Sequence, residues 1–303
     1  MPASRLDGRT ILVTGASSGI GYFVAEGLAG LGARIIIAAR SAERARAAIE
    51  LLPEPGRHRH LELDLSDLES IRSAGTRAGD SGALDGLIMN AGIIAASPAY
   101  STGPFGVEAT VDVNVLAHLE FLRLTLPALR RSPSARIVST GSMLTKKVPF
   151  DIDNWVAQSS YRPRIAYAMS KHAAEILGFE LDRRLVASGS RIRSVVTHPG
   201  GAIDALTPDR PPLHRRPFPI RLVAAAAAPL FSPLVQGKQS AAQSAIAALT
   251  APSLPARPYI GPRRGASGEP VFADPVPSSI DGRLGGRLWT HVESLLANPV
   301  LTS

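Results

Sequence analysis

The chain reads Thr14-Gly15-Ala16-Ser17-Ser18-Gly19-Ile20-Gly21 between an apolar run, Thr10 to Thr14, and a helical stretch that begins at Ile20. Glycines at such a place permit a tight turn, let the backbone approach an anion and leave the amides of the helix N-terminus facing it. The position after a strand and before a helix indicates a turn that binds the pyrophosphate of a dinucleotide. The residues expected to contact it are Gly15, Ser17, Ser18, Gly19, Ile20 and Gly21.

Two other interpretations of the same turn remain open. Gly15 to Gly19 also matches the G-x-S-x-G pattern of hydrolase nucleophile elbows, in which Ser17 would be an esterase serine. An elbow serine usually follows several strands, whereas Ser17 follows the first expected strand. A plain strand-to-helix turn without a ligand is the second alternative. The location of the glycines favours the dinucleotide site over both.

Beyond this turn, short apolar runs alternate with longer amphipathic segments as far as residue 200. Strands are expected at 10–14, 34–39, 60–65, 86–90, 136–140, 191–197 and 258–261. Helices are expected at 20–31, 42–51, 68–78, 106–130, 166–185, 240–249 and 284–296. This rhythm predicts the α/β class: a doubly wound parallel sheet of about seven strands with helices on both faces.

No linker separates two cores, so we expect a single domain over residues 1–303. Residues 201–237 interrupt the rhythm with a Pro- and Arg-rich half and an apolar half, which includes Leu222, Val223, Leu230, Phe231 and Leu234. Ligands of such sheets bind at the carboxyl ends of the strands, so this segment is expected to be a lid over a lipophilic substrate. Packing on the sheet, a dimer contact or a membrane-surface contact is the alternative. Residues 278–299 are expected to form a C-terminal helical extension.

Composition excludes several classes of function. The chain has no cysteine, which excludes a disulfide scaffold, a cysteine nucleophile, an iron–sulfur cluster and a thiolate zinc site. The net charge is +8, yet the basic residues never run beyond adjacent pairs and only 5% of residues are aromatic, so no nucleic-acid partner is expected. His58 and His60 have no further ligands at metal-binding spacing, so no metal site is expected.

The first residues contain no long apolar run, and the apolar stretch 220–235 is interrupted by Arg221, Pro229 and Pro233. Neither a secretory signal nor a transmembrane segment is therefore expected, and we expect a cytoplasmic protein. The sequence is compatible with a homodimer or a homotetramer.

Arg40 stands at the end of the second expected strand, where dinucleotide folds bind the adenosine ribose, and Ser41 follows it. No carboxylate is there to accept a hydrogen bond from a 2′-hydroxyl, whereas a guanidinium suits a 2′-phosphate by charge and by bidentate donation. The pair predicts NADP(H) as the cofactor, with Arg40 and Ser41 in contact with it. An ordinary exposed arginine at a strand end is the alternative.

Tyr167 and Lys171 form a Y-x-x-x-K pattern within an expected helix, so both side chains share one face. A neighbouring cation favours the phenolate and lowers the tyrosine pKa toward working pH. Such a phenol can exchange a proton with a substrate oxygen, which indicates acid–base chemistry. The alternative is an incidental pair on the surface.

Together these features resemble the short-chain dehydrogenase/reductase family. The matching elements are the T-G-x-x-x-G-x-G pattern of Thr14 to Gly21, Asn90-Ala91-Gly92 after the fourth expected strand, Asn114, a serine after the fifth, and Y-x-x-x-K. The resemblance covers residues 8–200 strongly and implies a Rossmann-like fold. Residues 114–118 and His198-Pro199-Gly200 are similar to the retinol-dehydrogenase and protochlorophyllide-reductase-like branch.

The resemblance implies a role for each matching residue. Ser142 would hydrogen-bond the substrate carbonyl, and Tyr167 would be the general acid in reduction. Lys171 would hold the nicotinamide ribose and depress the pKa of Tyr167, while Asn114 would anchor the water of a proton relay. Further cofactor contacts would come from Asp64, Leu65, Asn90, Ala91, Gly92, Pro199 and Gly200.

Two features depart from the family pattern: an inserted stretch, 146–164, before the tyrosine, and Asp204 where the family usually has a threonine. The expected function is an NADP(H)-dependent oxidoreductase of the ketoreductase or alcohol dehydrogenase type. It would move hydride between nicotinamide and a carbonyl or secondary alcohol of a small molecule. A redox-neutral dehydratase, epimerase or cyclase and a catalytically idle NADP(H)-sensing protein remain the alternatives.

Overall fold

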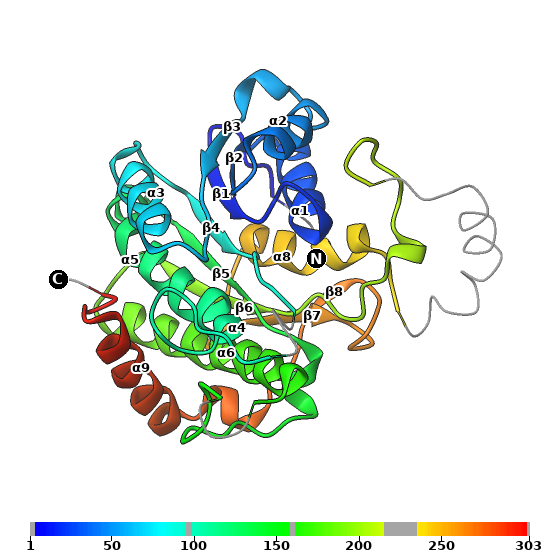
Figure 1. The fold of residues 1–303 in the computed structure, drawn as a ribbon. Coiled ribbons are helices and arrows are strands. Elements are labelled where there is room, and N and C mark those ends of the chain that lie inside the picture. The colour runs from blue at the N-terminus through cyan, green and yellow to red at the C-terminus, as the bar shows by residue number, and fades with distance from the viewer. Residues whose placement is uncertain (1–3, 95–98, 158–160, 215–234, 302–303) are drawn as a thin grey trace.

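The computed structural model describes residues 4–94, 99–157, 161–214 and 235–301. Within them the strands form one eight-stranded sheet in the order β3-β2-β1-β4-β5-β6-β7-β8 (Figure 1). The strands are β1 (Thr10–Thr14), β2 (Arg34–Ala39), β3 (Arg59–Glu62), β4 (Gly86–Met89), β5 (Arg136–Thr140), β6 (Arg193–Thr197), β7 (Tyr259–Pro262) and β8 (Pro270–Phe272). The first seven pair in parallel, and β8 is antiparallel to β7. The predicted doubly wound parallel sheet is confirmed.

The sequence does not predict β8. This strand has three residues and begins with Pro270, so it is too short to show alternation of polar and apolar residues. A proline at the start of a strand is typical of a sheet edge, where no partner needs its missing N–H. The eighth strand therefore extends the predicted sheet at one edge and leaves the order of the others unchanged.

Helices cover both faces of the sheet. On one face lie α1 (Gly19–Gly30), α2 (Ala42–Glu50) and α8 (Lys238–Thr250). On the other lie α3 (Leu68–Asp80), α5 (Ala117–Arg130) and α6 (Pro163–Ala187), with α9 (Gly282–Leu296) outside α6. The shorter helical turns are Pro55–Arg57, Ala109–Val111 (α4), Met143–Lys146, Asp204–Leu206 and Pro277–Ile280. No described helix is both long enough and apolar enough to span a bilayer.

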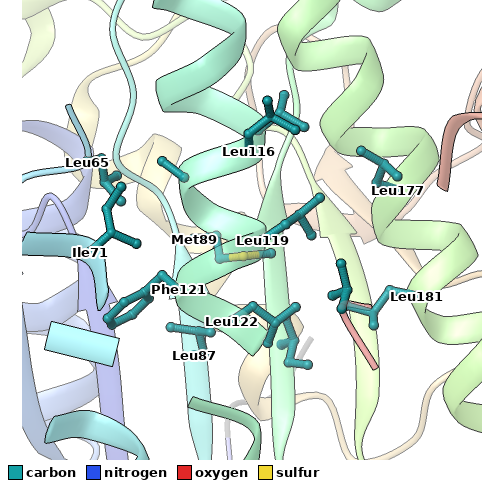
Figure 2. Packing of buried hydrophobic residues seen from close by; sticks show 14 of the residues in the cluster. Leu65, Ile71, Leu87, Met89, Leu116, Leu119, Phe121, Leu122, Leu177 and Leu181 are labelled. Atoms are coloured by element: carbon teal, nitrogen blue, oxygen red, sulfur yellow. The ribbon is translucent and has the colours of Figure 1, made fainter. Parts of the chain in front are cut away.

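The central strands build a hydrophobic cluster on each face. Because side chains alternate along a strand, Leu12 joins the cluster under α3, α5 and α6, whereas Ile11 and Val13 join the one under α1, α2 and α8. Figure 2 shows the first cluster, in which Phe121 of α5 and Leu177 of α6 pack with residues of β4. Each such fully buried side chain contributes about 1.5–3 kcal/mol.

The helix predicted over 106–130 begins three residues later than expected and contains a π turn in its first half. The helical region begins at Ala109, and Asp112–Leu116 form a π turn in which the amide of Ala117 donates to the carbonyl of Asp112. Hydrophobic periodicity reports which residues face the core, so a locally wider turn leaves no signal in it. The π turn carries Asn114, and such turns frequently occur at functional sites.

The predicted lid falls largely outside the described residues. These omitted positions are 215–234, which include Leu222, Val223, Leu230, Phe231 and Leu234. At the described ends of the segment, Arg210 Nε lies 2.7 Å from Glu26 Oε1 of α1, and the amide of Gln236 donates to the carbonyl of Gly201. The segment is therefore tied to α1 at Arg210, and its two ends are joined to each other, while the lid stays a prediction.

The expected C-terminal extension contains α9, which packs its apolar side on α6. Leu288, Trp289 and Val292 are buried, and the guanidinium of Arg184 lies 4.7 Å from the centroid of the Trp289 ring. A guanidinium over an indole ring adds a cation–π attraction to the packing. The final helix thereby braces α6 along its outer side.

Substitution of Trp289 tests this packing. Trp289→Ala should lower the free energy of unfolding by about 3–5 kcal/mol, because it leaves a cavity between α9 and α6. The neighbouring Thr290 is exposed, so Thr290→Ala should change it by less than about 0.5 kcal/mol. Denaturant titration measures both values. Equal effects of the two substitutions would contradict the packing of α9 on α6.

Candidate active site

The glycine turn between β1 and α1 has the geometry that a close approach of an anion requires. Gly15 and Gly19 adopt φ angles of 68° and 63°, in the left-handed region that favours glycine. A Cβ on Gly21 would lie 2.5 Å from Nδ2 of Asn90, and one on Gly15 would lie 2.9 Å from Cα of Ala91. No residue larger than glycine fits at Gly15 or Gly21 without displacing the turn.

The N-terminus of α1 faces the same turn. Ser17, Ser18 and Ile20 are partly exposed there. The Ser18 side chain makes no capping hydrogen bond, and the first turn of α1 contains no acidic residue. The partial positive charge of the helix N-terminus is therefore left for an external anion.

Thr14 and Asn90 join the carboxyl ends of β1 and β4. The Thr14 hydroxyl accepts hydrogen bonds from the amides of Asn90 and Ala91, each at 3.0 Å, and Nδ2 of Asn90 donates to the Thr14 carbonyl at 3.0 Å. The side chain of Asn90 is thus used to hold the two strands together. Ala91 presents its backbone beside the glycine turn.

The residues expected at the adenosine end differ in what their side chains do. Arg40 is exposed at the end of β2, while Ser41 Oγ accepts from the amide of Arg44 and caps α2. The strand predicted over 60–65 ends at Glu62, so Asp64 and Leu65 lie in the loop after β3. The pairing of β3 with β2 ends at Glu62, although apolar and polar residues continue to alternate up to Leu65.

Asp64 is held by its own loop. Its Oδ1 accepts from both the amide and the hydroxyl of Ser66, at 2.9 and 2.6 Å, and its own amide donates to Ser70 Oγ at 2.9 Å. Leu65 is buried in the core. The loop that follows β3 is therefore fixed beside the end of β2, where Arg40 stands.

Three elements bring the four predicted catalytic residues together. Asn114 comes from the π turn, Ser142 from the turn after β5, and Tyr167 and Lys171 from α6. Lys171 Nζ donates to the carbonyl of Thr140 at 3.0 Å. A Cβ on Gly92 would lie 2.9 Å from Oδ1 of Asn114 and 3.5 Å from Nζ of Lys171. The glycine thus lets the loop after β4 reach the catalytic helix.

Asn114 uses its whole side chain to tie the loop after β4 to α6. Its Oδ1 accepts from the amide of Ile93 at 2.9 Å, and its Nδ2 donates to the Ile93 carbonyl at 3.1 Å and to Ser170 Oγ at 2.9 Å. The Asn114 side chain is buried, so these bonds replace the water it has lost. The relay role that the family resemblance implies for Asn114 stays a prediction.

Burial governs the charges of the two catalytic groups on α6. Burial raises the pKa of Tyr167, and a hydrogen bond with the Ser142 side chain opposes that rise. Burial lowers the pKa of Lys171 to about 8, and the charge of Glu175 opposes that fall. The pKa of Tyr167 is therefore raised in this structure where the sequence predicts a lowering, and the hydrogen bond with Ser142 is the interaction that favours the phenolate.

The segment after β6 is shaped by Gly200 and His198. Gly200 has a φ of 71°, and a Cβ on it would lie 2.5 Å from the Ala266 carbonyl oxygen. Burial lowers the pKa of His198 to about 4, so its ring is neutral, and Nδ1 accepts from the amide of Gly200 at 3.3 Å. The Pro199 carbonyl accepts from Gln236 Nε2 at 2.8 Å. His198 therefore shapes the backbone here.

The two departures from the family pattern, Asp204 and the inserted stretch 146–164, which contains Trp155, have structural roles. The Asp204 carboxylate pairs with Lys238 Nζ at 2.5 Å, at the start of α8. Trp155 is fully buried and donates from Nε1 to His291 Nδ1 of α9 at 3.1 Å, so it covers the core. Among the described residues no group of three or more potential metal-ligating side chains occurs.

Sequence reasoning misses two buried polar residues near the site. His118 Nε2 lies 3.1 Å from the Thr14 hydroxyl, and burial lowers the pKa of His118 to about 4. Glu175 is fully buried four residues after Lys171. The available signal is the same for both: a titratable residue at a core-facing position of a helix, where burial is costly without partners.

Comparisons with known proteins agree with this geometry. The family model described as short chain dehydrogenase matches residues 9–207. Human retinol dehydrogenase 13 is 34% identical over 203 residues, which are 65% of this chain and 60% of the relative. Human retinol dehydrogenase 11 is 36% identical over 200 residues, 65% of this chain and 62% of the relative. The match thus spans about three fifths of the length of these curated relatives.

Solved structures extend the likeness beyond the part of the chain that the family model matches. A crystal structure of an uncharacterised protein from Mycobacterium paratuberculosis has a TM-score of 0.77 and 29% identity, covering 99% of this chain and 97% of that one. The RhlG/NADP active-site complex of Pseudomonas aeruginosa has a TM-score of 0.63 and 28% identity, covering 86% and 97%. The chain therefore belongs to the short-chain dehydrogenase/reductase family, in its retinol dehydrogenase-like branch.

Proposed function

We propose that this oxidoreductase uses NADP(H) and interconverts a carbonyl and a secondary alcohol on a lipophilic small molecule. The observation that carries the proposal is the meeting of Ser142, Tyr167 and Lys171 beside the glycine turn, at the carboxyl ends of the parallel strands. Ligands of open α/β sheets bind at this edge. The names of the retinol dehydrogenases, whose substrate is lipophilic, support the substrate class.

The described residues fit a bound dinucleotide. The cradle around Gly15 and Gly21 would be filled by any Cβ, whereas the space beside Gly19 is open. The glycine turn and the N-terminus of α1 would hold the pyrophosphate. Arg40 would pair with the 2′-phosphate, and the NADP complexes among the structural relatives support this choice of cofactor. The nicotinamide would supply the hydride.

The protein supplies the proton and the orientation. Ser142 would hydrogen-bond the substrate oxygen and hold it against the Tyr167 hydroxyl. During reduction Tyr167 would donate its proton to that oxygen, and in the reverse direction it would take it back. The protonated Lys171, whose pKa lies at about 8 through burial, would stabilise the phenolate that forms. We further propose that the protein is cytoplasmic, that it forms a homodimer or homotetramer, and that residues 201–237 form a lid.

The glycine turn is tested by a pair of matched substitutions. Gly21→Ala should weaken NADPH binding at least tenfold, because the new Cβ meets Asn90 Nδ2 and the Gly15 carbonyl at 2.5 and 2.6 Å. Gly30→Ala, on the same helix and with nothing within 4 Å of its Cβ, should leave binding unchanged. Fluorescence titration with NADPH measures both affinities. Similar affinities in the two variants would remove the glycine turn from the cofactor site.

Cofactor preference is tested at Arg40. Loss of a charge-assisted contact to the 2′-phosphate should cost about 1.5–3 kcal/mol, which is roughly a tenfold to hundredfold loss of NADPH affinity. Arg40→Asp should therefore reverse the preference from NADPH to NADH. The exposed Arg44, four residues further on, is the control, since Arg44→Ala should retain the preference. Equal affinity of the unmodified protein for both cofactors would refute the assignment.

The chemical step is tested at Tyr167. Tyr167→Phe should abolish turnover on a carbonyl substrate and leave NADPH affinity nearly unchanged, because only the proton donor is lost. Absorbance of reduced nicotinamide measures turnover across a panel of ketones and alcohols. If Tyr167→Phe kept most of the activity, the redox mechanism would give way to the redox-neutral enzyme or the NADP(H)-sensing protein.

A further inference from the structure

Glu175 is a buried carboxylate to which the proposed mechanism assigns no role. It lies on α6 one turn after Lys171 and two turns after Tyr167, so the three residues share a face of the helix. Its side chain is fully buried. A carboxylate in such surroundings is costly unless hydrogen-bond donors compensate it. The identity of these donors indicates what Glu175 does.

One set of donors belongs to the turn that carries Ser142. Glu175 Oε1 accepts from the amide of Ser142 at 3.2 Å and lies 3.4 Å from the Thr145 hydroxyl. Thr145 also hydrogen-bonds the Ser142 carbonyl at 2.9 Å. A Cβ on Gly141 would lie 2.2 Å from Oε1, so only glycine lets the turn approach the carboxylate. The main chain on both sides of Ser142 is thereby fixed against α6.

The other donors come from the C-terminal part of the chain, beyond the residues that the family model matches. The Tyr259 hydroxyl of β7 donates to Oε1 at 3.3 Å, and the Ser279 hydroxyl donates to Oε2 at 3.0 Å. Burial, reinforced by the charge of Glu175, raises the pKa of Tyr259, so this phenol remains a donor. Glu175 therefore joins the Ser142 turn to two C-terminal segments.

Glu175 also acts on the charge of Lys171. Burial disfavours the protonated ammonium, and the attraction of the Glu175 carboxylate opposes that effect. Among the described residues Lys171 forms no ion pair within 4.0 Å, and its Nζ donates to the neutral carbonyl of Thr140. The carboxylate one helical turn away is thus the charge that favours the lysine cation.

We propose that Glu175 is a positioning residue of the active site, which fixes the Ser142 turn, stabilises protonated Lys171 and depends on Tyr259 and Ser279 to remain ionised. The inference rests on the proposed dehydrogenase function. It adds to that function a requirement that the carboxylate be charged. Protonation of Glu175 weakens its hold on the amide of Ser142 and removes its attraction for Lys171 in one step.

Titration of Glu175 falls in a working range of pH. Burial raises the pKa of Glu175 to about 7, against the hydrogen bonds it accepts, of which that from Ser279 is the largest. Further titratable groups lie on the elements packed around it, among them Tyr167, Lys171, His172, Tyr259, His198, Lys146 and Lys147. Lys146 and Lys147 are exposed, and burial lowers the pKa values of His172 and His198, which disfavours the charged form of both histidines.

Glu175→Gln keeps the shape of the side chain and removes its charge. Its pH profile of kcat should lose the acidic limb near pH 7, and its alkaline limb should move down by about one pH unit as the Lys171 cation loses its partner. Glu180→Gln is the matched control, because Glu180 is a buried glutamate of the same helix that pairs with Arg183 and Arg184. The control should keep both limbs in place.

Ser279→Ala provides a second variant that touches neither Tyr167 nor Lys171. Removal of a donor to the ionised carboxylate raises the pKa of Glu175, so the acidic limb should move to higher pH while the alkaline limb stays. A purely structural role of the network would lower Tm and leave the acidic limb where it is. That result in both Glu175→Gln and Ser279→Ala would overturn the proposal.

A measurement without turnover separates this inference from the proposed function. The chain has four lysines, so the ε-carbon signal of Lys171 can be assigned in labelled protein from the Lys171→Arg variant. Glu175→Gln should lower the pKa of Lys171 below about 8, and Glu180→Gln should not. If no carbonyl substrate turns over, the proposed function fails while this titration still decides the role of Glu175. An unchanged Lys171 pKa in Glu175→Gln would refute the proposed role of Glu175.

Discussion

The hydroxyl of Thr14 is the interaction on which the rest of the site depends. By accepting the amides of Asn90 and Ala91, it fixes the carboxyl ends of β1 and β4 relative to one another. Ala91 then lies against the glycine turn, and Gly92 lies against Asn114 and Lys171. The Thr14 side chain, at the end of the first strand, thus sets the distance between the glycine turn and α6. Loss of its bonds would misplace groups on both sides.

Most of the sheet follows from the sequence because its central strands are short apolar runs between strong turn signals. Strands β4 and β5 show this clearly, since every residue of β4 and the three central residues of β5 are buried. The edges are harder. β8 is short and only partly buried, and Asp64 continues an alternating pattern after the backbone of β3 has stopped pairing. The alternation of polar and apolar residues indicates which side chains are buried, but it does not indicate whether a neighbouring strand is there to pair with.

The residues of the site likewise fall into those that the sequence predicts and those that it does not. Gly15, Gly21, Tyr167 and Lys171 can be identified from sequence because local spacing along one turn or one helix brings them together. Glu175 and the π turn at Asn114 cannot, because their partners come from elements distant in the chain. The donors to Glu175 lie on three separate segments, and no short pattern encodes such a meeting. Long-range polar contacts become visible only once the fold is in hand.

The Glu175 network also has a consequence for biosynthesis. The bonds between Thr14 and Asn90 span 76 residues and can form early, as soon as the fourth strand has left the ribosome. The bond from Ser279 to Glu175 spans 104 residues and waits for nearly the whole chain. A growing chain therefore completes its nucleotide turn well before the Ser142 turn gains its last support. Nucleotide capture can precede catalytic competence, and a truncated product could retain the first without the second.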